Sequence, residues 1–284
     1  MIPVVAGSNP VGHPNLAPRA PRHWRAPALR GATPQAAFRA VALAALEQIE
    51  SNTRGALIYD DPEFLHQLRV GMRRLRAALR AFRSVLARKE ARRVIRALRK
   101  VGPRLGAARD WDVLVARLEA DRASPVLLRK ARSQRAAARR AARRVLVSKR
   151  FAGIGPRVRA LAVAESGASL AQFGAAALTR AHRKLMSEAE GIDWADATAR
   201  HACRIRVKRL RYGCEFFVAA FPAKRASPYL AALKQLQDIL GALNDISVGR
   251  RLIGFDADEA ALLRRLEAAW SRFAKRPVFW RAPA

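Results

Sequence analysis

Basic side chains form a regular series in the segment from residue 62 to residue 87. The series consists of His66, Arg69, Arg73, Arg76, Arg80 and Arg83, separated by 3, 4, 3, 4 and 3 residues. Because an α-helix has about 3.6 residues per turn, these spacings place the side chains on one stripe of a helix. A guanidinium group offers a planar fork of N–H donors that matches two phosphate oxygens. The stripe therefore predicts the binding of several phosphate groups at a time.

A shorter basic series of the same kind follows later in the chain and consists of His201, Arg204, Lys208 and Arg211. It ends at Glu215, where the first series has Arg80. Arg74 and Arg209 adjoin the two series in the sequence. The candidate anion-binding residues are thus His66, Arg69, Arg73, Arg74, Arg76, Arg80, His201, Arg204, Lys208, Arg209 and Arg211.

An apolar stripe accompanies the first basic stripe. It consists of Leu65, Leu68, Met72, Leu75, Leu79, Phe82 and Leu86. Neighbouring residues are about 100° apart on a helix, so the basic stripe must lie beside the buried core and not opposite it. No acidic residue occurs between Glu63 and Glu90, so repulsion along the stripe is not compensated within the helix. This pattern favours anion binding over an ordinary solvated helix face.

The whole chain carries a large excess of positive charge. Against 22 Asp and Glu there are 55 Lys and Arg, which gives a formal net charge of +33. Such a charge favours a polyanionic partner: nucleic acid, inorganic polyphosphate or an anionic membrane. No apolar run approaches the roughly 18 residues that span a bilayer, so no membrane association is expected. Cys203 and Cys214 would lie about 16 Å apart on one helix, too far for a disulfide, which predicts a reduced cytoplasmic protein.

The aromatic residues distinguish between the polyanions. The basic stripes contain no aromatic residue between their cations on which a nucleobase could stack. The chain also has no recognised nucleic-acid-binding motif. A chain of bare phosphates therefore suits the stripes better, and a nucleic acid is the weaker alternative partner.

The chain is expected to be all-α. Residues 1–32 are rich in proline and arginine and are expected to form a flexible tail. Thr33, Asp61, Ser124 and Ser227 each precede a proline, which is typical of an N-cap before the first helical position. The expected helices are 34–55, 62–87, 89–101, 111–122, 125–149, 170–189, 195–218, 228–243, 245–253 and 257–275. Breaks are expected at Gly102-Pro103 and around residues 150–168.

The two halves of the chain resemble each other at an offset of 135 residues. At this offset Phe38 meets Phe173, His66 meets His201, Arg73-Arg74-Leu75-Arg76 meets Lys208-Arg209-Leu210-Arg211, Gly106 meets Gly241, and Asp110 meets Asp245. We therefore expect an internal duplication, with one repeat over about 33–150, a linker over about 151–168 and a second repeat over about 169–280.

These residues resemble the CHAD domain family. The resemblance rests on HQLRVGMRRLR from His66 to Arg76 and LGAARDWDVL from Leu105 to Leu114, with RIRVKRLRY from Arg204 to Tyr212 and LGALND from Leu240 to Asp245. It covers roughly residues 33–280 and implies two four-helix bundles related by a pseudo-twofold axis, with basic residues lining a central cavity or groove. It further implies binding of inorganic polyphosphate and association with polyphosphate granules. Gly71 departs from the alanine-like residue that is usual in the first motif.

No catalytic residue, metal site, cofactor or small-molecule substrate is expected. The family is often fused to a triphosphatase domain with a Glu-x-Glu-x-Lys motif, but here Glu188-Ala189-Glu190 is followed by Gly191-Ile192. Asp110 and Asp245 are expected as N-caps, and Asp112 in a first helical turn. His182 is expected on a solvent-facing helix side. A phosphohydrolase that uses the basic stripes is the alternative of a different class.

Overall fold

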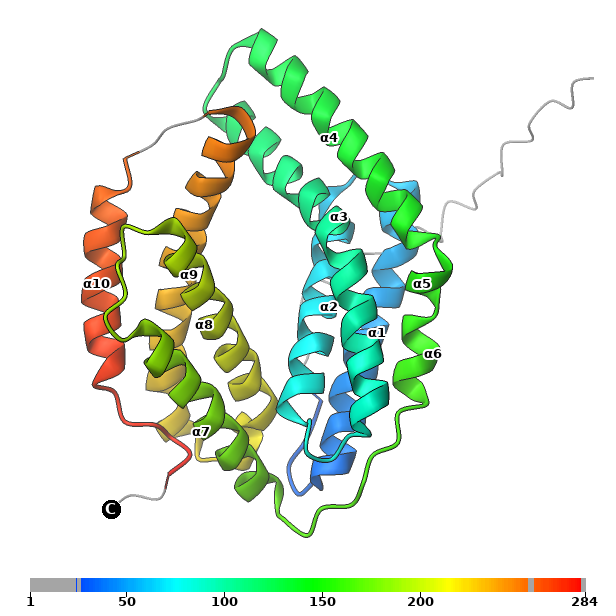
Figure 1. Cartoon of the computed structure of the whole chain (residues 1–284), viewed down its shortest axis with the longest axis vertical. Helices are drawn as coiled ribbons and strands as arrows, with labels where there is room; N and C mark the ends of the chain where they lie inside the picture. The colour runs from blue at the N-terminus through cyan, green and yellow to red at the C-terminus, as the bar shows by residue number, and fades with distance from the viewer. Residues whose placement is uncertain (1–23, 25–26, 255–257, 282–284) are drawn as a thin grey trace, which may run out of the picture.

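The computed structural model describes residues 24, 27–254 and 258–281, and this part of the chain is helical without any strand (Figure 1). The helices are α1 (Pro34–Ile58), α2 (Pro62–Ala81), α3 (Arg88–Ala120), α4 (Pro125–Leu146), α5 (Lys149–Ala152), α6 (Ile154–Arg159), α7 (Leu170–Ala189), α8 (Ala197–Phe217), α9 (Ala223–Ile253) and α10 (Ala260–Ala274). A short 3₁₀ helix, Val218–Ala220, follows α8. The predicted all-α class is confirmed.

The helices form two groups, α1 to α6 and α7 to α10 (Figure 1). In the first group α1 packs on α2, and α3 packs on both α2 and α4; in the second group α8 packs on α7 and α9, and α9 packs on α10. The groups meet along α2 and α8, the helices that carry the two basic stripes. None of the described helices is long and apolar enough to span a bilayer.

Most of the predicted helix starts are confirmed. The side chains of Thr33, Asp61 and Ser124 each accept a hydrogen bond from a backbone N–H in the first turn of α1, α2 and α4. The prediction for Ser227 is wrong, because α9 already begins at Ala223 and the Ser227 hydroxyl donates to the Ala223 carbonyl within the helix.

The predicted breaks inside α3 and α9 are wrong. Each helix runs without interruption through its Leu-Gly dipeptide, and α3 also contains Pro103. A glycine costs about 1 kcal/mol and a proline about 3 kcal/mol in a helix interior. In α3 this cost is offset by burial of Leu98, Val101 and Leu105 along one continuous face. Asp110 and Asp245 are consequently mid-helix residues and not N-caps.

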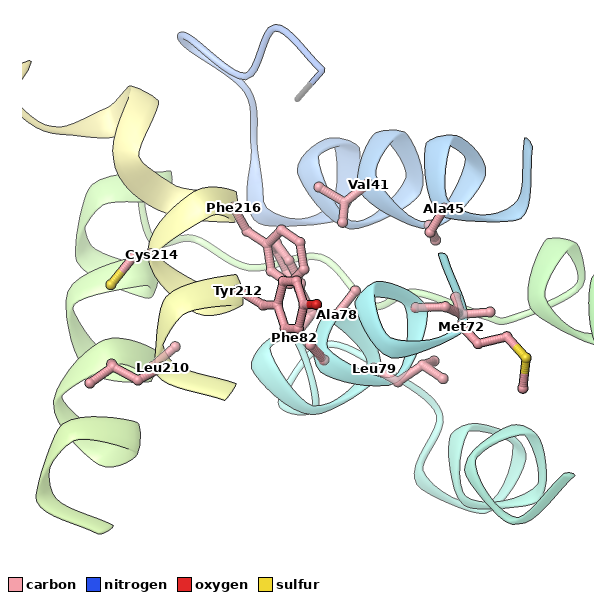
Figure 2. Close-up of a cluster of buried hydrophobic side chains, with 14 of the residues drawn as sticks. Val41, Ala45, Met72, Ala78, Leu79, Phe82, Leu210, Tyr212, Cys214 and Phe216 are labelled. Atoms are coloured by element: carbon pink, nitrogen blue, oxygen red, sulfur yellow. The ribbon is translucent and has the colours of Figure 1, made fainter. Parts of the chain in front are cut away.

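The core extends across both helical groups. The ring of Phe82, directly after α2, lies 5.7 Å from Phe38 of α1, 5.6 Å from Phe173 of α7 and 5.0 Å from Phe217 of α8, between ring centroids. Figure 2 shows Phe82 meeting Tyr212 and Phe216 of α8 in this core. The two groups are therefore joined by burial of large aromatic surfaces.

The predicted tail and linker are partly packed against this core. Leu29 is buried, and the ring of Trp24 stacks over the Arg74 guanidinium at 4.6 Å. The rest of the predicted tail, residues 1–23 and 25–26, lies outside the described residues. Within the linker, α5 and α6 form, and the Ala164 N–H donates to the Val85 carbonyl at 2.8 Å.

Candidate anion-binding site

Cations from α2 and α8 come together on one surface. The Arg73 Nε donates a hydrogen bond to the Tyr212 hydroxyl at 3.3 Å. Burial is the largest cause of the lowered pKa of Arg204 and of Lys208, and the positive charge of Arg73 lowers both further. We call this surface the basic seam and define it by Arg69, Arg73, Arg76, Arg204 and Lys208, all partly buried.

Arg69 lies across α3 at the point where that helix has a glycine. Its Nη1 donates to the Gly102 carbonyl at 3.4 Å. A Cβ added at Gly106 would lie 3.0 Å from the same nitrogen, so the glycine makes room for the guanidinium. Burial and the neighbouring Arg73 lower the pKa of Arg69 to about 10, while Asp110 raises it.

Lys208 is the seam residue whose charge is closest to titrating at neutral pH. Burial, Arg204 and Arg73 lower the pKa of its ammonium group to about 7, against the opposing effect of Asp245. Repulsion between the cations of the seam therefore costs free energy that a bound polyanion would relieve.

Two carboxylates lie within this cationic surface. Asp110 of α3 has a pKa raised by burial and by Asp245, whereas Arg69, Arg251 and Arg204 lower it. Its Oδ2 lies 3.7 Å from Arg251 Nη2. The second carboxylate is Asp245, which the 135-residue offset pairs with Asp110; the prediction that both residues are N-caps is wrong because α3 and α9 continue through them. Asp112, expected in a first turn, is instead buried within α3 and pairs with Arg139 at 2.7 Å.

Arg74 and Arg211 are engaged inside the protein. The Arg74 side chain is buried, forms an ion pair with Glu215 at 3.6 Å and donates to Gln48 Oε1 at 3.3 Å. Arg211 pairs with Glu215 at 2.7 Å and donates to Gln237 Oε1 at 2.7 Å. Arg74 therefore connects α2 with α1 and α8, whereas Arg211 connects α8 with α9. Neither Tyr212 nor Glu215 is a cation of the second stripe, although Tyr212 directly follows Arg211 and Glu215 lies one helical turn after it.

The two matched histidines have different surroundings. His66 is partly buried, and its pKa is lowered to about 4 by burial and by Arg109. His201 is exposed, with its Nδ1 3.1 Å from the Asn244 side-chain oxygen. His182 was predicted to face solvent, which is wrong: it is half-buried and its Nδ1 lies 2.9 Å from the Tyr229 hydroxyl.

Arg80 and Arg209 lie beyond the seam, next to α7. Burial lowers the pKa of Arg80 to about 10, followed by the effects of Arg209 and Arg76. Both arginines line a cavity bounded by α2, α7 and α8. Within the described residues, no group of three or more His, Cys, Asp or Glu side chains is placed to hold a metal ion.

The fold and the seam define a class of helical proteins in which two helical groups contribute cations to one surface. The CHAD domain family model matches residues 40–254, and the chain belongs to this family. The crystal structure of the CHAD domain from the plant Ricinus communis is similar at 31% identity with a TM-score of 0.71, over 92% of this chain and 94% of that one.

PptA from Streptomyces chartreusis shares the fold at 18% identity, with a TM-score of 0.58 over 86% of this chain and 98% of that one. A search of the curated proteins finds no match to this chain.

Proposed function

We propose that this CHAD domain binds inorganic polyphosphate at the basic seam without catalysing a reaction. The observation that carries the proposal is the contact of Arg73 with Tyr212, which brings the cations of α2 and α8 to one surface. A long polyanion can then contact both helical groups at once, and each group raises the effective concentration of ligand for the other. The cytoplasm and its polyphosphate granules are the proposed location.

The surroundings of the seam favour a bare phosphate chain over a nucleic acid. Tyr212 is an aromatic residue in contact with the seam cation Arg73, but it is buried, with 5% of its surface exposed. The ring of Tyr212 is therefore not available for stacking by a nucleobase. Arginine forks still match phosphate oxygens in the absence of bases.

Binding can be tested with two double variants of matched design. Arg69→Gln with Arg73→Gln removes two cations of α2, and Arg204→Gln with Lys208→Gln removes two of α8. If one chain contacts both helices, each double variant should weaken polyphosphate binding by about a hundredfold or more, since a hydrogen bond to a charged group contributes about 1.5 kcal/mol or more. The control is Arg129→Gln with Arg140→Gln, two exposed arginines of α4.

The titrations also separate the alternatives. Independent surfaces would leave each double variant with about half of the sites at unchanged affinity, and the shared seam would then be wrong. Equal affinity for polyphosphate, DNA and RNA at one salt concentration would instead favour a general nucleic-acid-binding role. Release of orthophosphate from polyphosphate in the presence of a divalent cation would show a phosphohydrolase.

A further inference from the structure

The cavity bounded by α2, α7 and α8 is lined by none of the five residues that define the basic seam. Its volume is about 600 Å³. Its floor is apolar and is made mainly of small residues: Ala77, Ala81, Ala177, Ala181, Gly213 and Phe217. Alanines from α2 and α7 predominate in this floor, so a larger side chain at one of these positions would reduce the space.

The rim of this cavity is cationic. It carries Arg80, Arg83, Arg180, Arg183 and Arg209. Within the described residues, none of these five side chains forms an ion pair with a carboxylate. By contrast, Arg206 and Lys184, which also line the cavity, share Glu188 as their partner.

We propose that this cavity binds an amphiphilic anion, namely a phosphate or carboxylate group attached to an apolar chain or ring. The apolar body would cover the alanine floor, and the anionic group would lie among the rim arginines. A bare phosphate chain would gain little from the floor, because its oxygens would be desolvated against methyl groups without hydrogen bonds. A neutral apolar molecule would leave the repulsion between the rim cations uncompensated. The volume lies within the range of about 300 to 1,000 Å³ that is usual for small-molecule sites.

The site goes beyond the proposed binding of polyphosphate. Of the residues that define the basic seam, none lines the cavity. Burial, Arg206 and Arg76 lower the pKa of Arg209, although Glu188 raises it, so positive charge predominates around this rim residue.

Octyl phosphate is a suitable probe, measured by isothermal titration calorimetry on the full chain. Orthophosphate provides the anion without the apolar body, and octyl glucoside provides the apolar body without the anion. We expect octyl phosphate to bind with saturation and at least about tenfold tighter than either, since both the floor and the rim contribute.

Two variants test the floor and the rim separately. Ala181→Leu places a larger side chain in the cavity while keeping a good helix former on α7. Arg180→Gln with Arg183→Gln removes two exposed rim cations. Each should weaken octyl phosphate binding by about tenfold or more. Arg129→Gln with Arg140→Gln should leave it unchanged, and circular dichroism should show that every variant is folded.

Several results would overturn the proposal. Octyl phosphate binding no tighter than orthophosphate would do so, leaving an acidic segment of a partner protein as the remaining occupant to test. Equal binding of octyl glucoside, or unchanged binding by either cavity variant, would also exclude it. Loss of octyl phosphate binding in the presence of saturating polyphosphate would show that the cavity belongs to the polyphosphate path. The polyphosphate affinity of the cavity variants reports the proposed function independently.

Discussion

Arg74 of α2 and Glu215 of α8 form an ion pair, with Arg74 Nε 3.6 Å from Glu215 Oε2, that joins the two helical groups directly behind the basic seam. The pair belongs to a longer polar connection. Gln48 accepts from Arg74 on one side, and Arg211 pairs with Glu215 on the other. Arg73 adjoins Arg74 and Tyr212 adjoins Arg211 in the sequence, so this polar connection and the Arg73–Tyr212 hydrogen bond both link α2 to α8.

Replacing Arg74 by Met should destabilise the protein without removing a seam cation. Methionine keeps much of the apolar stem but leaves Glu215 with Arg211 alone and removes the donor to Gln48. We expect the free energy of unfolding to fall by about 2 to 4 kcal/mol, at or somewhat below the usual cost of breaking a buried pair, because Glu215 keeps one partner. Urea unfolding followed by circular dichroism measures this.

The exposed pair of Lys234 and Asp238 provides the control for this measurement. Their side chains are 71% and 56% exposed. Lys234→Met should therefore cost less than about 1 kcal/mol. Similar losses for the two variants would mean that the Arg74 pair has no special role in joining the groups.

The salt dependence of polyphosphate binding should reflect the number of seam contacts. For nucleic acids, the logarithm of the affinity falls with the logarithm of salt concentration by about 0.7 to 0.9 per phosphate contact. We expect a steep slope for the native chain and a slope shallower by about 1.5 for Arg69→Gln with Arg73→Gln, over about 50 to 200 mM salt. A native slope near zero would show that the seam is not the binding surface.

Polyphosphate binding should be accompanied by proton uptake at Lys208. In the free protein its pKa is lowered to about 7. A bound polyanion favours the ammonium form, so above pH 7 the complex should take up as much as about one proton, and affinity should fall as pH rises. Calorimetry at pH 8 in buffers of different ionisation enthalpy measures the uptake.

The Lys208→Arg variant separates this uptake from titration of the ligand itself. Arginine keeps its charge at pH 8, so uptake should largely disappear while affinity is retained. Equal uptake by both proteins would assign the proton to the polyphosphate chain ends or to another residue.

His66 should make the free protein less stable in acid. Its folded-state pKa of about 4 is lower than the ordinary value of 6.5, so the unfolded state binds more protons between these two values. The contribution of His66 to stability is therefore present above pH 6.5 and is lost as pH falls toward 4. His66→Gln should flatten the pH dependence of the urea midpoint over this range; a curve parallel to that of the native chain would contradict the assignment.

The sequence predicted the helical class and the stripe on α2 because both depend on local periodicity. It did not predict that Arg74 points inward, since adjacent residues of a basic run look alike until the partner Glu215, 141 positions later, is placed beside it. The continuity of α3 and α9 was missed for a related reason: tertiary burial outweighs the local cost of Gly106 and Pro103. The internal duplication stays a prediction, and the different exposure of His66 and His201 shows that matched residues have acquired different surroundings.

The matched glycines Gly106 and Gly241 provide the most direct test of how the seam is built. A Cβ at Gly106 would lie 3.0 Å from Arg69 Nη1, whereas nothing lies within 4 Å of a Cβ at Gly241. Alanine in a helix interior is favoured over glycine by about 1 kcal/mol, so Gly241→Ala should stabilise the protein by about that amount and leave polyphosphate binding unchanged.

Gly106→Ala should behave differently because the new methyl group displaces the Arg69 guanidinium. The flexible end of the arginine can move, so the free energy of unfolding should change by less than about 1 kcal/mol. Polyphosphate affinity should nevertheless fall by about threefold to tenfold, since one charge-assisted contact is misplaced. In an Arg69→Gln background the same substitution should have little further effect on binding. If Gly106→Ala weakened binding equally with and without Arg69, the glycine would act through the helix and not through the guanidinium that lies on it.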